Sequence, residues 1–146
     1  MSPRKVVIDT DILIDHLTHD RSGSVARRSV MRTTMAEFFC YTTVFNAIEL
    51  FELCETPRQI LAAEGALSAL KILGMNGKSG RSLGVVFRLA RKRGLRDFDT
   101  LVAGLCVESR LPLLTGRPEK YRGVSSLKII PVKHAVQRAK TELFGA

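Results

Sequence analysis

The chain has 146 residues, of which 45% are hydrophobic and 25% charged, a composition typical of a soluble domain with a buried core. Its formal charge of +9 favours an anionic partner such as nucleic acid, although a basic surface that binds an acidic protein, or nothing specific, would have the same charge. No apolar run reaches the roughly 18 residues of a membrane span and no signal peptide is visible, so we expect a cytoplasmic protein without a membrane partner.

The first predicted element is a short strand that runs directly into an acid. Residues 6–8 are β-branched and predict a buried strand, and Asp9 follows at its end. A buried carboxylate is strongly unfavourable unless a cation or several hydrogen bonds satisfy it. Because ligands of open α/β sheets lie at the carboxyl ends of strands, Asp9 is a candidate site residue, with Thr10 and Asp11 beside it. Alternatively, Asp9 only caps a helix that begins near residue 11.

Helices and short strands alternate in the next part of the chain. We predict helices over about residues 11–17 and 24–38, the second capped by Ser24, and a strand over residues 40–43. The helix expected over residues 44–54 has an apolar stripe on one face, while Asn46 and Glu49 share another face. Glu49 is a second candidate site residue, although most glutamates on helices are simply solvated.

The middle of the sequence is predicted to be helical. Thr56 and Pro57 are typical of the start of a helix, which we expect over residues 57–73, with a flexible helix–helix connection over residues 74–80 and a helix over residues 82–93. The connection contains Gly77-Lys78-Ser79, but it is not a phosphate loop, because Ile72 stands where that motif needs a glycine. Four basic residues lie at or just after the end of the 82–93 helix: Arg91, Lys92, Arg93 and Arg96. This is more positive charge than is needed to stabilise the carboxyl end of a helix dipole.

Two acids open the helix that follows. Asp97 and Asp99 precede an apolar segment with several small residues, which suits close packing against a sheet. Both acids could also interact only with the helix dipole. Residues 111–115 predict a buried strand that ends in Thr115, residues 116–123 a polar loop, and residues 127–132 a strand that Pro131 places at a sheet edge. A helix is expected over residues 134–144.

The three cysteines, Cys40, Cys54 and Cys106, are far apart and lie in apolar surroundings. This arrangement indicates free thiols in a reducing compartment. A zinc site is improbable because His16 and His19 have no partner ligands elsewhere, and we assign no role to a histidine.

Taken together, these segments resemble the PIN-domain nucleases and, within them, the VapC-type toxins of prokaryotic toxin–antitoxin pairs. The resemblance covers about residues 6–132, and its most specific part is the segment 97–104, similar to the family's third acidic motif. Residues 7–15, 46–52 and 113–121 are similar to the first, second and fourth motifs. The resemblance implies a single domain over residues 1–146. Its fold would be α/β with three layers, α/β/α, around a short, mainly parallel sheet of four or five strands, with strands 6–8 and 113–115 side by side.

The resemblance also implies a metal site. Asp9, Glu49 and Asp99 match the metal-binding acids, and Thr115 matches the hydroxyl of the fourth motif, while Thr10 and Asn46 are expected to support them. The family often has an acid or amide two residues after that threonine, where this chain has an arginine; we therefore expect Asp97, rather than Glu119, as the fourth ligand. Oxygen ligands of this kind select Mg²⁺ or Mn²⁺ over zinc.

The expected function is that of a Mg²⁺- or Mn²⁺-dependent endoribonuclease toxin. Its expected partners are RNA, held through the cluster of Arg91, Lys92, Arg93 and Arg96, an acidic antitoxin from an adjacent gene, and a second copy of the chain in a homodimer. Two alternatives remain open. One is a non-catalytic RNA-binding or protein-interaction module with a degenerate metal site, and the other is a PIN nuclease of RNA maturation without an antitoxin.

Overall fold

The computed structural model describes residues 4–22, 29–91 and 97–132. These residues form a five-stranded sheet in the order β3-β2-β1-β4-β5, in which every neighbouring pair is parallel. The strands are β1 (Arg4–Ile8), β2 (Phe38–Thr43), β3 (Lys71–Leu73), β4 (Leu113–Thr115) and β5 (Ile129–Pro131). The α/β class and a mainly parallel sheet of four or five strands were expected from the sequence, and β5 with Pro131 lies at an edge as predicted, whereas β3 was not predicted as a strand.

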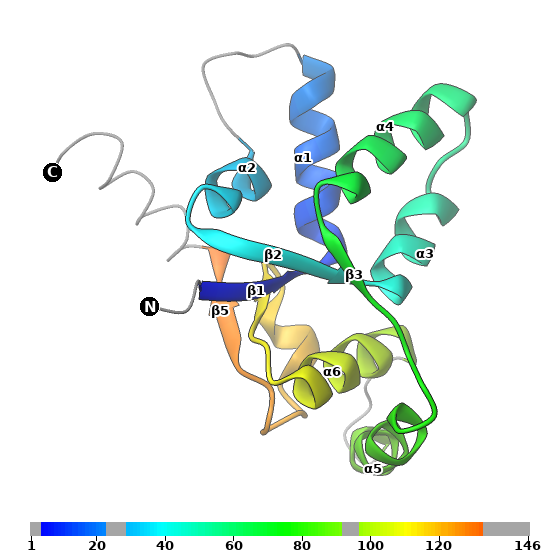
Figure 1. Ribbon diagram of the computed structural model, residues 1–146, viewed down its shortest axis with the longest axis vertical. Helices are drawn as coiled ribbons and strands as arrows, with labels where there is room; N and C mark the ends of the chain where they lie inside the picture. The colour runs from blue at the N-terminus through cyan, green and yellow to red at the C-terminus, as the bar shows by residue number, and fades with distance from the viewer. Residues whose placement is uncertain (1–3, 23–28, 92–96, 133–146) are drawn as a thin grey trace, which may run out of the picture.

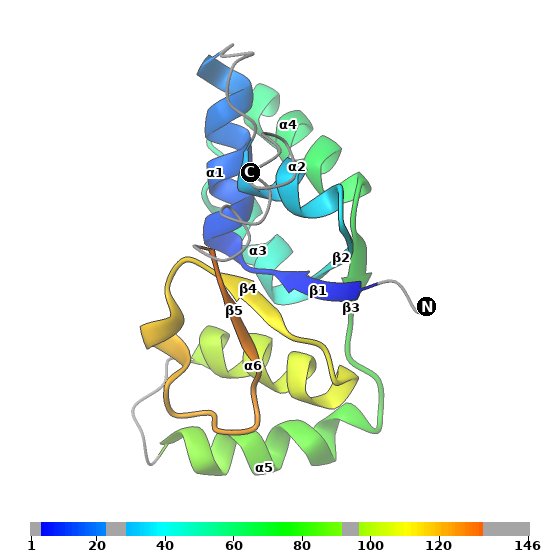
Figure 2. The same ribbon diagram turned by 90° about the vertical axis from the view of Figure 1, so that its left-hand side faces the viewer.

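Helices cover both faces of this sheet and give it three layers (Figures 1 and 2). Four helices lie on one side: α1 (Thr10–Ser22), α2 (Val30–Met35), α3 (Val44–Glu52) and α4 (Pro57–Ser68). Two lie on the other side: α5 (Ser79–Arg91) and α6 (Asp97–Ser109). No helix among the described residues is both long enough and apolar enough to cross a bilayer.

The first strand connects the two halves of the core. Val6 and Ile8 pack into the cluster on the side of α1 to α4, whereas Val7 packs into the cluster formed with α6. All three side chains are buried, because successive residues of a strand point to opposite faces and both faces are covered. This explains why the segment reads as an uninterrupted apolar run.

Two helices begin with reciprocal capping hydrogen bonds that the sequence encodes locally. Thr43 caps α3 by accepting from the Asn46 backbone N–H, and the Asn46 side chain accepts from the Thr43 backbone in return. Thr56 and Gln59 form the same arrangement at the start of α4, with Pro57 in the first turn. The predicted start of that helix is therefore confirmed.

The end of α4 was predicted wrongly. The helix ends at Ser68, and residues 71–73 form β3, which pairs with β2. Leu67, Leu70 and Ile72 have a spacing close to that of a helix, so the sequence pattern predicted that the helix continues. The strand instead forms because residues 71–73 pair with β2, which is distant in the sequence. Residues 74–78 therefore connect a strand to α5, and not two helices.

Other boundaries also differ from those predicted. The first strand begins at Arg4, and α1 continues to Ser22 instead of ending near residue 17. Within the described residues, the helix expected over 24–38 is limited to α2, which Ser29 caps; Ser24 lies outside them. The second strand begins at Phe38, and α5 begins at Ser79, a few residues before the predicted start. The helix expected over residues 134–144 lies outside the described part of the chain.

Of the small residues of α6, Ala103 packs into the cluster with Val7 and Leu113 of the sheet, as expected, whereas Gly104 has a different neighbour. Gly104 faces α5 rather than the sheet, and a Cβ at this position would collide with the Leu83 side chain. The glycine therefore lets the two helices approach closely. The cysteines are free thiols, as predicted, and burial raises the pKa of both Cys40 and Cys106 to about 12.

Candidate active site at the carboxyl ends of the central strands

The candidate site lies where β1 and β4 end side by side. Val7 and Ile8 pair with Leu113 and Leu114 in parallel register, which confirms that the two strands are neighbours. Asp9 directly follows β1, and its backbone N–H donates a hydrogen bond to the Leu114 carbonyl, with an N···O distance of 3.1 Å. Asp9 is thus held by the sheet itself at the end where ligands of parallel sheets bind.

The Asp9 carboxylate is buried, 3% exposed, and it accepts four hydrogen bonds. Oδ1 accepts from the Thr10 backbone N–H at 2.9 Å and from Asn46 Nδ2 at 3.0 Å. Oδ2 accepts from Thr115 Oγ1 at 2.8 Å and from the Tyr121 hydroxyl at 3.0 Å. A carboxylate can accept roughly four hydrogen bonds, so these donors satisfy the buried charge of Asp9.

Asp9 caps a helix, as one interpretation of the sequence expected, and its side chain also contacts other elements. Its backbone carbonyl accepts from the N–H groups of Ile12 and Leu13, so the residue does begin α1. Its side chain, however, also turns toward Asn46 of α3 and Thr115 of β4. Burial and the charge of Asp9 raise the pKa of Tyr121 above its ordinary value, so the phenol remains a hydrogen-bond donor to Asp9.

Thr10 links Asp9 to the second predicted acid. The Thr10 hydroxyl donates to Glu49 Oε1 at 3.1 Å and accepts from Asn46 Nδ2 at 2.9 Å. Burial raises the pKa of Glu49, and the negative charges of Asp9 and Asp99 raise it further, while the Thr10 hydrogen bond and the positive charge of Lys120 oppose the shift. Glu49 is therefore not the freely solvated helix charge of the alternative interpretation.

The third predicted acid, Asp99, lies in the first turn of α6 and forms an ion pair. Lys120 Nζ lies 3.3 Å from Asp99 Oδ1, and the Asp99 side chain is only 8% exposed. Asp97, the expected fourth ligand, is the first residue of the same helix and is exposed. Glu119, the other candidate for a fourth ligand, is exposed as well.

Asp11 is a further carboxylate at the site, and it was not among the expected ligands. Its Oδ2 accepts from the Gly116 backbone N–H at 2.8 Å, while no donor among the described residues reaches its buried Oδ1. Burial and the nearby charge of Asp9 raise its pKa, against the opposing effects of two backbone hydrogen bonds and Lys120. A Cβ at position 116 would lie 2.6 Å from Asp11 Oδ2, so this close approach requires glycine.

Lys120 and Tyr121 are the other contributors that the sequence interpretation missed. Both belong to a 3₁₀ helix, η1 (Pro118–Tyr121), inside the segment expected to be a solvated polar loop. Two signals could have identified it: Pro118 suits the first turn of a helix, and an aromatic residue in a polar loop usually has a buried partner.

The donor chemistry of this site fits a hard divalent cation, since the acids supply only carboxylate oxygens and Asp11 has one without a partner. No three acidic, histidine or cysteine side chains in the described part of the chain are arranged as ligands of one ion. Binding an ion would therefore require side chains to turn.

The basic cluster expected to bind RNA is described only in part. Arg91 is exposed at the end of α5, whereas Lys92, Arg93 and Arg96 lie outside the described residues.

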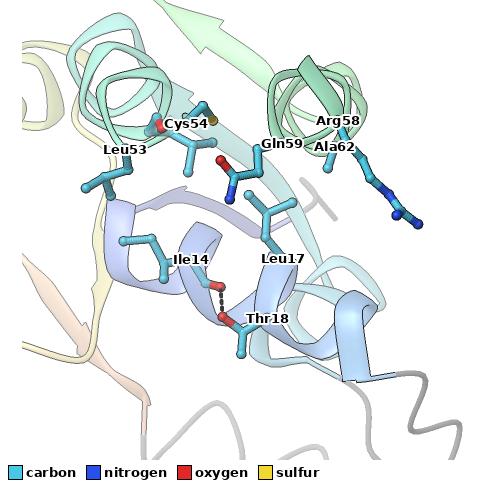
Figure 3. Close-up of a pocket in the computed structure, with 9 residues that line it drawn as sticks. Ile14, Leu17, Thr18, Leu53, Cys54, Arg58, Gln59 and Ala62 are labelled. Atoms are coloured by element: carbon cyan, nitrogen blue, oxygen red, sulfur yellow. Dashed lines mark hydrogen bonds between the residues drawn. The ribbon is translucent and has the colours of Figure 1, made fainter. Parts of the chain in front are cut away.

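A separate apolar groove lies between α1, α3 and α4 (Figure 3). It has a volume of about 650 Å³. Ile14 and Leu17 line it from α1, Leu53 and Cys54 from the end of α3, and Ala62 from α4. Ile14 is 39% exposed and Leu53 is 59% exposed, so the groove presents apolar side chains to solvent.

Comparisons with known proteins identify the fold. No protein-family model matches the chain, and no curated protein matches it in sequence. Many solved structures are similar in fold, including the following three. VapBC2 from Rickettsia felis, bound to a DNA fragment from its promoter, has a TM-score of 0.69 and 14% identity over 86% of this chain and 97% of that chain. DNA-bound VapBC from Salmonella typhimurium has a TM-score of 0.69 and 19% identity over 88% and 98%.

The third, VapBC-5 of the VapBC family of toxin–antitoxin systems from Mycobacterium tuberculosis, has a TM-score of 0.57 and 20% identity over 88% of this chain and 99% of that chain. At these identities the likeness concerns the fold, and it extends over nearly the full length of each neighbour. The five-stranded parallel sheet with helices on both faces agrees with it. The chain therefore has the VapC-type PIN-domain fold.

Proposed function

We propose that this protein is a metal-dependent endoribonuclease and the toxin of a type II toxin–antitoxin pair. The observation that supports the proposal is the hydrogen-bonded link between Asp9 and Glu49 through Thr10 and Asn46, with Asp99 close enough for its charge to act on Glu49. The three acids come from three separate segments, yet Glu49 is influenced by the charges of both other acids. Such a concentration of buried negative charge is costly without a cation.

Mg²⁺ or Mn²⁺ is the cofactor that this donor set suits best. We infer that Asp9, Glu49 and Asp99 hold the ion. Asp97 remains our proposed fourth ligand, and the unpartnered Oδ1 of Asp11 offers a further oxygen. A bound ion would supply a water of lowered pKa and would neutralise charge on the phosphate during hydrolysis.

The remaining side chains would position these acids. Asn46 and Thr115 fix the two oxygens of Asp9, and Thr10 connects Asp9 with Glu49. RNA is the substrate implied by the family resemblance, and Arg91, Lys92, Arg93 and Arg96 are the side chains that we propose bind its phosphates. The cytoplasm, where RNA is abundant, is the proposed location.

An antitoxin is the proposed protein partner. The similar structures from Rickettsia felis and Salmonella typhimurium are VapBC assemblies, and the Mycobacterium tuberculosis one belongs to a toxin–antitoxin family. In this chain the apolar groove between α1, α3 and α4 offers a surface for an apolar segment of such a partner. A homodimer is also expected for the toxin.

The central test is cleavage of single-stranded RNA with Mg²⁺ or Mn²⁺ and then with EDTA. We expect metal-dependent cleavage that leaves a 5′-phosphate and a 3′-hydroxyl, because a water, and not the ribose 2′-hydroxyl, attacks the phosphate. Asp9→Asn and Asp99→Asn should abolish cleavage, since each removes a charge with little change in shape, while Glu119→Gln should cut like the parent.

Three results would contradict the proposal: products with a 2′,3′-cyclic phosphate, cleavage that EDTA does not affect, or RNA binding with no cleavage at all. The last would instead favour the non-catalytic module. Circular dichroism of each variant shows whether loss of cleavage reflects loss of folding.

A further inference from the structure

A lysine already lies within the acidic cluster. Lys120 Nζ is 3.3 Å from Asp99 Oδ1, and the Lys120 side chain is 29% exposed, so it reaches the cluster from the solvent side. The positive charge of Lys120 therefore lies directly beside one of the proposed metal-binding acids.

The backbone around Lys120 holds it in this place. Tyr121, the next residue, is 1% exposed and its hydroxyl donates to Asp9 Oδ2 at 3.0 Å. The Lys120 backbone N–H donates to the Arg117 carbonyl at 3.1 Å within the same short helix. Two consecutive residues of η1 thus contact two different acids, Asp9 and Asp99, that are far apart in the sequence.

We propose that Lys120 is an internal counter-ion of the acidic site and competes with a divalent cation for Asp99. This inference rests on the proposed function, because it concerns the same metal site. An ion bound to Asp99 Oδ1 would compete with the Lys120 ammonium group for that oxygen. An ion bound to Asp99 Oδ2 would still lie close to the ammonium group. Two cations that close repel each other strongly in a partly buried site. Lys120 must therefore leave Asp99 when the ion binds.

The test is direct Mn²⁺ binding by isothermal titration calorimetry, without RNA and without an activity readout. Lys120→Met removes the charge and keeps most of the side-chain length, and Lys120→Gln is a second variant of the same kind. We expect the Mn²⁺ affinity of both to rise by about fivefold or more, in the range of coupling between two binding events. Lys120→Arg keeps the charge and should bind as the parent does.

Lys71→Met is the matched control, since Lys71 is exposed on the edge strand β3, which β2 separates from β1. It should leave the Mn²⁺ affinity unchanged. The melting temperature in EDTA gives a second readout: Lys120→Met should lower it, because the acids lose their counter-ion, and Mn²⁺ should restore more stability to this variant than to the parent.

The outcomes separate the two proposals. If the parent binds Mn²⁺ and both charge-removing variants bind it equally or more weakly, Lys120 is not a competing counter-ion, although the metal site stands. If the parent fails to bind and Lys120→Met binds, the inference is supported in its strongest form. If neither the parent nor any variant binds Mn²⁺, both the inference and the metal-dependent function are overturned.

Discussion

The side chains around Asp9 are tied together by one hydrogen-bond network that spans the whole sequence. Its donors come from α1, α3, β4 and η1, so the carboxylate joins four elements that are distant along the chain. A buried carboxylate with this many donors is compatible with a stable fold only while the full set is present. Each lost donor leaves part of the charge unsatisfied and lowers the stability of the protein. Tyr121 is the donor that tests this dependence most cleanly.

Tyr121→Phe should lower the free energy of unfolding by about 1.5 kcal/mol or more, since it removes one hydrogen bond to a charged, buried acceptor and changes little else. Urea denaturation in EDTA measures this. Tyr41→Phe on β2 is the control, because Tyr41 is partly exposed and packs its ring against Phe39. Equal stability of the two variants would show that the Tyr121 hydroxyl contributes nothing to the network.

At the residue scale, the sequence predicted the part of the candidate site that follows strand ends. Asp9 and Thr115 are placed by two apolar strands, and their adjacency follows from a parallel sheet. Lys120 and Tyr121 were not predictable in the same way. Their segment carries no strong helical or strand period, and its one-turn helix is held by long-range contacts to Asp9 and Asp99.

At the scale of elements, local signals predicted helix starts better than ends. The capping pairs of α3 and α4 act within a few residues and are visible in the sequence. The strand β3 is only three residues long and depends on pairing with β2, so no local pattern could distinguish it from the last turn of a helix. The groove between α1, α3 and α4 likewise forms only when these three helices pack together, so no local sequence pattern reveals it.

If the proposed antitoxin binds in the groove, Leu53→Asp should prevent the complex, because Leu53 is 59% exposed, lines the groove, and the substitution would place a charge on an apolar contact. Co-expression followed by co-purification measures the loss, and RNA cleavage by the isolated variant should remain at the parent level. Leu61→Asp is the matched control: Leu61 is 68% exposed on α4 but does not line the groove. If both variants retain the partner equally well, the antitoxin binds elsewhere.

At the scale of the whole molecule, a strongly basic protein carries an acidic site. The formal charge is +9, yet Asp9, Asp11, Glu49 and Asp99 all lie at one end of the sheet. An RNA phosphate approaching these acids is repelled unless a cation intervenes, whereas basic side chains elsewhere attract the rest of the backbone. Binding of RNA should therefore depend on where the positive charge lies, and not only on its sum.

This can be measured with a cleavage-inactive Asp99→Asn background and a fluorescent single-stranded RNA, titrated at several salt concentrations. A first variant replaces four basic residues by glutamine at the end of α5 and in the segment after it: Arg91, Lys92, Arg93 and Arg96. A second replaces four exposed basic residues elsewhere, with the same loss of net charge: Arg4, Lys5, Arg58 and Lys71.

If the first cluster binds the phosphates, its variant should bind more weakly, and the slope of log affinity against log salt should fall by about 0.7 for each phosphate contact that is lost. The second variant should keep nearly the parental slope, because long-range attraction by net charge alone is screened within roughly 10 Å at 0.1 M salt. Equal losses in the two variants would mean that RNA responds to the overall charge. A parental slope in the first variant would place the phosphate-binding surface outside the Arg91–Arg96 cluster.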